Sequence, residues 1–500
     1  MSEKERLAGV LLHPTSLPGK WVVGDLGEAA SRFVDKLHDA GVHLWQVLPL
    51  GPTGFGDSPY AARSTFAGNE LLISLDMLYE DGYLELVDIL SRPPACERVD
   101  YGLARTVKMP LLRKAAMAFL EEPAADYEEF CREKEWWLDD YALYQVLCDQ
   151  YNDSRWFSVW DEALRRRDPQ ALEKERQRYA EEIELYKVYQ YFFFTQWTAL
   201  RKYANGCGVR IIGDIPIFVA PDSVDAWTNT RLLKIDEEGH QEASSGVPPD
   251  AFSATGQLWG NPLYRWSEHE RTGFAWWVSR IRETLKMCDI VRIDHFRGFA
   301  ACWEVPAGED TAMNGKWVPS PGQKLLDALR RELGDELPII AEDLGVITPD
   351  VEALRDRNGL PGMKILQFAF SAAEDGEIDA SNAYLPHNVD ENSVIYTGTH
   401  DNDTTLGWYM SQDDGMKDIV RRYFECGDED IVYRFIRAAL GSRSRYAIIP
   451  FQDVLGLGTD ARMNVPSTCG TSNWSWKMTQ SMLDDDNFGR LKYYIRMYAR

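Results

Sequence analysis

Short apolar runs rich in β-branched residues recur along the chain, and long polar or helix-favouring stretches separate them. Eight of these runs predict strands, at residues 9–12, 44–48, 210–214, 290–294, 338–342, 364–368, 394–397 and 447–450. Nearly continuous apolar character is typical of parallel strands that are covered on both faces. Eight such strands alternating with helical sequence predict a (β/α)8 TIM barrel, with a doubly wound open sheet as the main alternative.

Two intervals between the runs are too long for ordinary crossovers. Residues 75–208 are rich in helix formers with apolar positions near helical spacing, which predicts a mostly helical insertion after the second strand. Residues 215–288 are rich in Gly, Pro and aromatics, which predicts a loop-rich insertion after the third strand. Long irregular segments of compact domains usually serve as lids or binding loops. We therefore expect one catalytic barrel over residues 1–500, with 215–288 forming an active-site lid.

Composition narrows the functional classes. The chain has 500 residues, 45% of them hydrophobic and 27% charged, which is ordinary for a globular protein. Its net charge of −25 argues against nucleic acid and anionic membranes as partners. The chain has no signal-peptide pattern, no membrane-length apolar stretch and no C-x-x-C pair among its eight cysteines. We expect a cytoplasmic protein.

The fourth predicted strand ends in V-R-I-D-H-F-R-G, where charged residues directly follow apolar ones. Side chains alternate along a strand, so Arg292 and Asp294 should point into the mouth of the barrel. Val291 and Ile293 should pack on the surrounding helices, and the same alternation predicts that His295 faces the helices. An isolated Arg-x-Asp would favour a structural ion pair.

The acidic pattern recurs at other strand ends. Glu342 ends the run in P-I-I-A-E-D-L-G, Asp214 ends another in R-I-I-G-D-I-P, and His400 with Asp401 follows a third in V-I-Y-T-G-T-H-D-N-D. Active sites of this fold are built from strand ends and βα loops. Several acidic strand ends at one face therefore favour carboxylate chemistry.

Two carboxylates in different protonation states can cleave a glycosidic bond. The nearby guanidinium of Arg292 favours the ionised form of Asp294, as a nucleophile requires. Glu342 lies in an apolar run without a basic neighbour, which favours a raised pKa and the role of general acid. Asp401 could steady the charge on the sugar, with His400 as a hydroxyl donor. Metal ligation by the same residues is the weaker interpretation, because no recognised metal spacing is present.

Five motifs together resemble those of a known family. V-R-I-D-H-F-R-G, I-I-A-E-D-L-G and G-T-H-D-N-D, preceded by D-S-P-Y and G-D-I-P-I-F, look like the motifs of the 4-α-glucanotransferases of glycoside hydrolase family 77, also called amylomaltases or disproportionating enzymes. The resemblance covers essentially residues 8 to 500. It implies a (β/α)8 barrel related to the α-amylases, retention of anomeric configuration and no obligatory cofactor. The implied substrates are maltooligosaccharides and α-1,4-glucans.

The resemblance also implies residue roles. It makes Asp294 the nucleophile, Glu342 the general acid/base and Asp401 the transition-state stabiliser. The implied sugar-binding residues are Ser58, Tyr60, Asp214, Gln257, Trp259, Arg292, His400 and Asn473. The loop P-P-D-A-F-S-A-T-G-Q-L-W-G-N-P-L-Y matches the family's lid over the acceptor side. Phe55, Ser467 and Lys477 depart from the residues that are common in relatives, namely tyrosine, glycine and arginine.

Most aromatic residues are expected to pack in the core or between helices. The tryptophans assigned to such packing are Trp136, Trp137, Trp197, Trp276 and Trp277. Trp259 is the exception, because it lies beside a glycine in a loop and can offer a flat face to sugar C–H groups. His38, His240 and His269 are expected at the surface.

Three rival functions remain open at this point. An α-amylase-type hydrolase would share the three carboxylates. A catalytically inactive glucan-binding protein would explain the aromatic content, and a metal-dependent enzyme would use the same acidic residues. Protein partners are left open.

Overall fold

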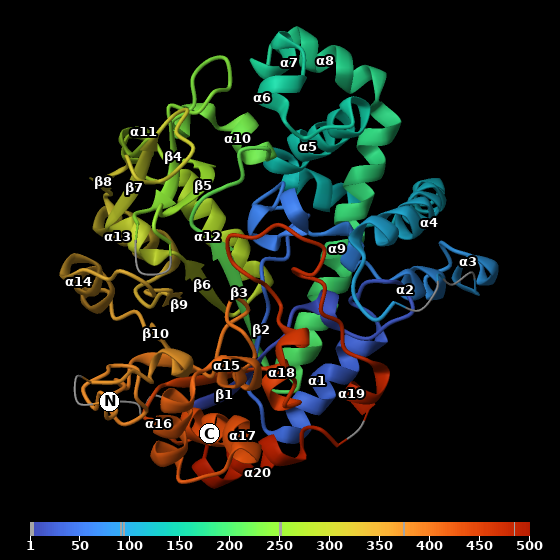
Figure 1. Cartoon of the computed structure of the whole chain (residues 1–500). Helices are drawn as coiled ribbons and strands as arrows, with labels where there is room; N and C mark the ends of the chain where they lie inside the picture. The colour runs from blue at the N-terminus through green and yellow to red at the C-terminus, as the bar shows by residue number, and fades with distance from the viewer. Residues whose placement is uncertain (1–4, 91–92, 94–95, 250–252, 374–375, 485) are drawn as a thin grey trace.

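The computed structural model describes residues 5–90, 93, 96–249, 253–373, 376–484 and 486–500. Within these residues eight parallel strands close into a barrel, and a second sheet of four strands lies beside it (Figure 1). The closed barrel confirms the predicted fold class. It also excludes the open doubly wound sheet.

The barrel strands follow the predicted apolar runs, with small shifts at their ends. They are β1 (Leu7–Leu11), β2 (Leu44–Gln46), β3 (Arg210–Pro216), β6 (Ile290–Asp294), β9 (Ile339–Ala341), β10 (Gly362–Ile365), β11 (Ser393–Tyr396) and β12 (Tyr446–Pro450). Their order around the barrel is β1-β12-β11-β10-β9-β6-β3-β2. Strands such as β1 and β12 are buried along their whole length, as expected for strands covered on both faces.

Helix α1 (Glu28–Ala40) illustrates how the outer layer forms. Its apolar residues Ala30, Phe33, Val34 and Leu37 recur at helical spacing and are buried, so they form one face against the barrel. The ring of Phe33 meets Trp45 of β2 edge-on, with the ring centroids 5.2 Å apart. The helix ends where Gly41 adopts a left-handed φ of 78°, a conformation that glycine accepts without strain.

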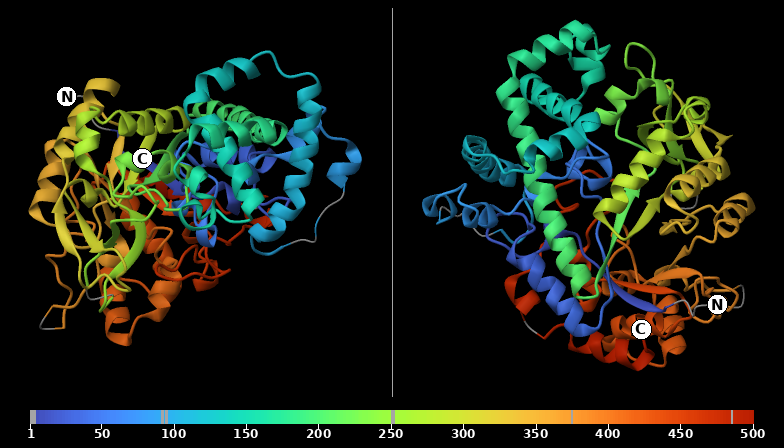
Figure 2. Two further views of the ribbon diagram at one scale, coloured as in Figure 1. Left: turned by 90° about the horizontal axis from the view of Figure 1, so that it is seen from above. Right: turned by 180° about the vertical axis from the view of Figure 1, so that it is seen from behind.

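Further helices complete the outer layer (Figure 2). They are α12 (Ala275–Met287), α13 (Gly322–Leu333), α14 (Pro349–Arg357), α15 (Thr405–Ser411), α16 (Asp414–Phe424), α17 (Ile431–Gly441), α18 (Phe451–Val454), α19 (Gln480–Asp484) and α20 (Gly489–Tyr498). Helix α20 packs against both α1 and α17. The barrel itself is closed by the pairing of β1 with β12.

The described residues between β2 and β3 form a series of helices on one side of the barrel (Figure 1). They are α2 (Leu75–Glu80), α3 (Leu86–Leu90), α4 (Tyr101–Glu121), α5 (Tyr127–Tyr151), α6 (Trp156–Val159), α7 (Glu162–Arg165), α8 (Pro169–Arg178) and α9 (Ala180–Gly206). Helices α5 and α9 pack against each other, and α9 leads back into β3. Lys108 of α4 is fully buried and donates 2.7 Å hydrogen bonds to the carbonyls of Leu71 and Ile73, which joins this region to the loops after β2.

The second sheet is antiparallel and is not predicted by the sequence pattern. Its order is β5-β4-β7-β8, made of β4 (Ala243–Val247), β5 (Gln257–Pro262), β7 (Ala301–Pro306) and β8 (Lys316–Pro319). Two of these strands lie within residues 215–288, together with α10 (Val224–Thr228), α11 (Trp266–Arg271) and α12. The segment expected to be rich in loops therefore contains regular structure and pairs with strands that follow β6.

Candidate active site

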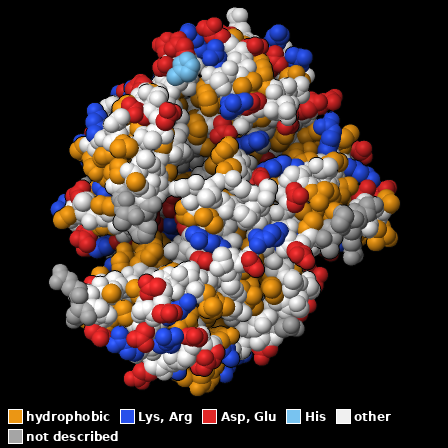
Figure 3. All heavy atoms as spheres, in the orientation of Figure 1, with side chains coloured by type: hydrophobic (Ala, Val, Ile, Leu, Met, Phe, Trp, Pro, Cys, Tyr) orange, Lys and Arg blue, Asp and Glu red, His pale blue; other side chains and the backbone are white. Residues whose placement is uncertain are grey.

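The charged residues at the strand ends gather at one end of the barrel. Asp214 of β3 lies opposite Arg292 of β6 in the strand register, and Ile293 of β6 lies opposite Ala341 of β9. Asp294 and Glu342 follow Ile293 and Ala341, so they lie side by side at the ends of two adjacent strands. Figure 3 shows that this face of the molecule is hollowed near its centre, with acidic side chains at depth.

Arg292 bridges two carboxylates inside the barrel mouth. Its Nη1 donates to both oxygens of Asp214, at 2.8 and 2.7 Å, and its Nη2 donates to Asp294 Oδ1 at 2.9 Å. Arg292 and Asp214 are almost fully buried, whereas 31% of the Asp294 side chain remains exposed. One guanidinium therefore fixes Asp294 in position and leaves part of its carboxylate accessible.

Glu342 is held by backbone groups on both of its oxygens. Oε2 accepts a 2.6 Å hydrogen bond from the backbone N–H of His295, and Oε1 accepts one of 2.8 Å from Leu344. Burial, and next the negative charge of Asp294, raise the pKa of Glu342 to about 8. Burial also raises the pKa of Asp294, but the adjacent Arg292 guanidinium opposes this rise directly. At neutral pH the raised pKa favours a proton on Glu342, whereas the Arg292 guanidinium favours negative charge on Asp294.

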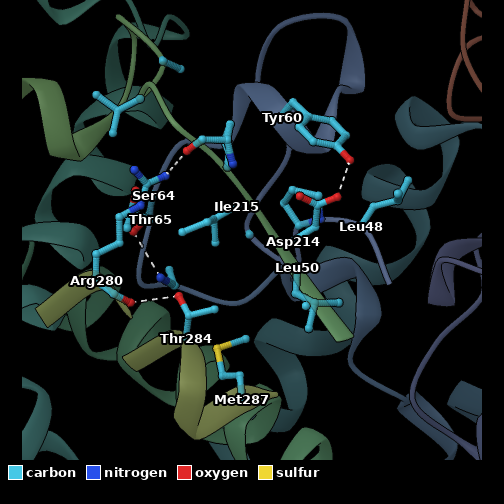
Figure 4. A pocket seen from close by; sticks show the side chains of 18 of the residues that line it. Leu48, Leu50, Tyr60, Ser64, Thr65, Asp214, Ile215, Arg280, Thr284 and Met287 are labelled. Atoms are coloured by element: carbon cyan, nitrogen blue, oxygen red, sulfur yellow. Dashed lines mark hydrogen bonds between the residues drawn. The ribbon is translucent and has the colours of Figure 1, made fainter. Parts of the chain in front are cut away.

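Asp401 joins the same network through two aromatic rings. The Tyr60 hydroxyl donates to Asp214 Oδ2 at 2.8 Å (Figure 4). The Tyr60 ring also stacks on His400, with the ring centroids 4.9 Å apart. His400 Nε2 lies 3.4 Å from Asp401 Oδ1. Hydrogen bonds and ring contacts thus connect Asp294 to Asp401 through residues from four separate parts of the chain.

Two residues that the sequence analysis missed hold Asp401. Asn464 Nδ2 donates to Asp401 Oδ1 at 2.7 Å, and Arg462 Nη2 donates to its backbone carbonyl at 2.6 Å. The backbone N–H of Asn464 also bonds to the carbonyl of His400. Both residues lie in R-M-N-V-P, which is not an apolar run, so no strand signal marks them.

The remaining predicted sugar contacts lie in three different settings. Ser58 Oγ accepts from the backbone N–H of Tyr60 at 3.2 Å and so caps the turn that carries Tyr60. Trp259 is 37% exposed, donates to Gln257 Oε1 at 3.2 Å and meets the His295 ring edge-on at 4.6 Å. Asn473 is buried, and its amide bonds to Val465 and Thr468 of its own loop.

The lid motif is described only in part. Residues 250–252 of P-P-D-A-F-S-A-T-G-Q-L-W lie outside the described residues. The part that carries Gln257 and Trp259 is strand β5, and its contact with His295 brings the second sheet beside the end of β6.

Two histidine predictions are wrong. His295 does not face the helices: the strand ends at Asp294, and His295 has a left-handed φ of 54°, so alternation no longer applies and the ring lies against Trp259 and Phe218. His269 is fully buried, because its ring packs on Tyr264 and its Nε2 lies 3.2 Å from the carbonyl of Leu232. Burial lowers the pKa of His295 to about 3 and that of His269 to about 4, so both rings are neutral.

The three departures from the family pattern lie in different surroundings. Phe55 is 74% exposed, and Ser467 adopts a left-handed φ of 61° that glycine would accept more readily. Lys477 is buried and donates to the carbonyl of Gly19 at 3.1 Å.

A small cavity lies behind Tyr60 and Asp214, on the far side of β3 (Figure 4). Its volume is about 70 Å³, well below the several hundred Å³ of a small-molecule site. Arg280 forms part of its wall and donates to the carbonyls of Pro216 and Ile217, which follow Asp214. Among the described residues we find no group of three or more His, Cys, Asp or Glu side chains arranged to hold a metal ion.

Comparison with known proteins connects this geometry to a family. The model of the 4-alpha-glucanotransferases, glycoside hydrolase family 77, matches residues 12–482. The chain belongs to this family. The 4-alpha-glucanotransferase of Synechocystis sp. is 46% identical over 99% of this chain and 98% of its own length. That of Thermus thermophilus is 47% identical over 98% of each chain.

A solved structure from the same family has the same fold. The amylomaltase from Streptococcus agalactiae, in complex with acarbose, superimposes with a TM-score of 0.95 at 39% identity, over 99% of this chain and 100% of that one. Within the described residues of the present chain, no helix is both long and apolar enough to span a membrane.

Proposed function

We propose that this chain transfers segments of α-1,4-glucans to the 4-hydroxyl of an acceptor glucose or glucan, with Asp294 as nucleophile, Glu342 as general acid/base and Asp401 as transition-state stabiliser. The substrates proposed are maltooligosaccharides and longer α-1,4-glucans, and the proposed location is the cytoplasm. The observation that carries the proposal is the pair of carboxyl groups at the ends of β6 and β9, of which Asp294 accepts a hydrogen bond from Arg292 and Glu342 is buried against the backbone N–H of His295.

In the first step an oxygen of Asp294 attacks the anomeric carbon of the donor. Glu342 gives its proton to the departing O4, so the sugar on the reducing side leaves with a free hydroxyl. The donor segment remains as an ester on Asp294. In this proposal Asp401, which accepts a hydrogen bond from Asn464, balances the positive charge that develops on the sugar ring.

In the second step the proton moves in the opposite direction. The Glu342 carboxylate removes the proton from the acceptor's 4-hydroxyl, and that oxygen attacks the anomeric carbon and displaces Asp294. Two inversions give net retention, and a new α-1,4 bond replaces the old one. Water can replace the acceptor, so transfer needs a site that excludes water. The contact of Trp259 with His295, the residue after β6, supports the proposal that Trp259 contributes to this exclusion.

The test is the product ladder from pure maltotriose. A transferase yields glucose and longer maltooligosaccharides with no net gain in reducing ends, whereas an α-amylase-type hydrolase increases reducing ends steadily. We expect Asp294→Asn to lose at least about 10⁴-fold in kcat, because a neutral amide cannot form the ester. Near-normal turnover by this variant would falsify the assignment.

The same assay separates the other rivals. A protein that only binds glucan would leave maltotriose unchanged. A metal-dependent enzyme would lose activity in chelator, whereas we expect full activity there. Asp343→Asn is the matched control, because Asp343 follows Glu342 but pairs with Arg355 of α14, away from the other carboxylates. It should retain far more activity than Asp294→Asn.

A further inference from the structure

A second cavity lies away from the proposed catalytic carboxylates, where α6 and α7 approach α10, α11 and the turn at residues 235–239. Its volume is about 530 Å³, within the range of small-molecule sites. Five arginines contribute to its wall: Arg165, Arg166, Arg167, Arg231 and Arg265. We call it the arginine cavity. Figure 1 shows α6 and α7 at the top of the molecule, beside α10.

Two of these arginines have no carboxylate partner. Arg165 Nη1 donates only to the backbone carbonyls of Phe157 and Glu238, at 3.3 and 3.5 Å, and its buried Nε has no partner. Arg231 is exposed and, among the described residues, forms no hydrogen bond or ion pair. Two guanidinium charges therefore face this cavity without direct neutralisation.

Most of the other charged side chains in the wall form ion pairs or hydrogen bonds with neighbouring groups of the protein. Arg166, Arg167 and Arg265 form ion pairs with Glu238, Asp140 and Glu242. Three acidic side chains also contribute to the wall: Asp236, Glu237 and Glu268. Asp236 accepts from the backbone N–H groups of its own turn, and Glu268 pairs with Arg271. The five wall arginines and Arg271 thus face six carboxylates in all, so an anion would be attracted by the two arginines that no carboxylate pairs with and not by a general excess of positive charge.

Guanidinium groups match phosphate oxygens in both charge and geometry. Inorganic phosphate alone would fill only a small part of 530 Å³, so the cavity suits a phosphate attached to a larger polar group. We propose that the arginine cavity binds a phosphomonoester of a small polar molecule, such as a sugar phosphate, with its phosphate held by Arg165 and Arg231.

The arginine cavity is joined to the strand that carries Trp259. Strand β5 continues through Tyr264 to Arg265, whose backbone N–H donates to the carbonyl of Leu232 at 2.8 Å. A bound phosphomonoester would connect α7 to the base of this strand. Any effect of the bound phosphomonoester on glucan transfer would rest on the proposed function. Binding of the phosphomonoester to the arginine cavity does not rest on it.

Isothermal titration calorimetry on the full chain tests the proposal, at constant ionic strength in chloride. The probes are glucose 6-phosphate, inorganic phosphate and glucose. We expect glucose 6-phosphate to bind, glucose not to bind, and Arg231→Glu to weaken binding of the phosphate ester at least about 10-fold. Arg231 has no internal partner, so this change should leave the fold intact, which circular dichroism checks. Arg165→Gln should weaken binding in the same way.

The matched control is Arg132→Glu, which makes the same charge reversal at a side chain that is 72% exposed on α5. Equal loss of binding in this control and in Arg231→Glu would overturn the proposal. It would also be overturned if glucose 6-phosphate gave no binding heat in the chloride buffer. Binding of inorganic phosphate as tightly as the ester would overturn the assignment to an ester. Maltotriose turnover without phosphate should stay unchanged in all these variants, so a failed binding test says nothing against the transfer reaction.

Discussion

At the scale of single residues, two chemically similar carboxyl groups differ in their surroundings. Arg292 contacts Asp294 directly, whereas Glu342 receives only backbone N–H groups and lies deeper. Their proposed roles follow from this contrast rather than from their own chemistry. The sequence pattern predicted the contrast, because Arg292 is two residues from Asp294, whereas Glu342 ends an apolar run and has no basic neighbour.

The pH dependence of turnover reports the proton on Glu342. With a pKa of about 8, this carboxyl loses its proton above that pH and can no longer act as an acid. We expect kcat/KM for maltotriose to fall above about pH 8. A profile that stays flat to about pH 10 would contradict the role of Glu342.

The same proton affects stability. Folding raises the pKa of Glu342 from 4.5 to about 8, so in this window the folded state holds a proton that the unfolded state has lost. The contribution of Glu342 to stability is therefore lost as pH rises through the window. Glu342→Gln carries no such proton, so its stability relative to the parent should increase from about pH 5 to pH 8, by at most about 1.4 kcal/mol per pH unit. Urea unfolding at several pH values measures this, and the same variant should be inactive.

Asn464 extends the site beyond the residues that the sequence suggested. Its amide donates to Asp401 and has no replacement in Asn464→Ala, so Asp401 should lose its orientation. We expect kcat to fall about 10- to 100-fold with little change in the folded state. Asn392→Ala is the control, because it removes an amide that donates to the carbonyl of Gly359 at a half-buried position. Equal activity in both variants would count against the role of Asn464.

At the scale of elements, the barrel strands were predictable and the second sheet was not. Strands buried on both faces are nearly continuous apolar runs, and all eight stand out in the sequence. In contrast, β4, β5 and β8 are short and partly exposed, and they contain Gly, Pro or Ser, which favour turns. The pairing of β4 with β7, which follows β6, depends on contacts distant in the sequence, and no local pattern records such contacts.

The second sheet gives the lid a testable role. Removing the indole in Trp259→Ala should admit water beside the glycosyl ester, so the ratio of hydrolysis to transfer should rise several-fold. Reducing-end release from maltotriose measures hydrolysis, and the product ladder measures transfer. Trp136→Ala is the control, because Trp136 is 51% exposed and lies on the edge of Phe66 in the helical region. An unchanged ratio of hydrolysis to transfer in Trp259→Ala would contradict the role of Trp259 in excluding water.

At the scale of the whole molecule, distant segments are joined by a few buried polar contacts. Lys108 is an example, since it bonds two carbonyls of the loops after β2 and lies 3.8 Å from Asp25. Such contacts escape sequence analysis because a lysine within a helix is usually exposed. The barrel itself could be predicted, because its strands are marked individually and only one closed arrangement accommodates eight of them.

Lys108→Met should therefore destabilise the fold while sparing the chemistry. Two carbonyls would lose their buried donor, at a cost of roughly 2–4 kcal/mol in the free energy of unfolding. Lys114→Met removes a partly exposed lysine from the same helix, and we expect a change of less than about 1 kcal/mol. Chemical denaturation measures both, and equal stability in the two variants would contradict the anchoring role of Lys108.

The hydrogen bond from the His295 backbone to Glu342 has a consequence for substrates of different chain length. One backbone hydrogen bond links the segments that carry the two carboxyl groups, because the N–H of the residue after Asp294 donates to Glu342 directly. Their spacing is then set by the backbone and not by which sugars occupy the cleft. A short oligosaccharide and a polymer would meet the same pair of reacting groups, and the enzyme needs no adjustment at its centre as the chain grows.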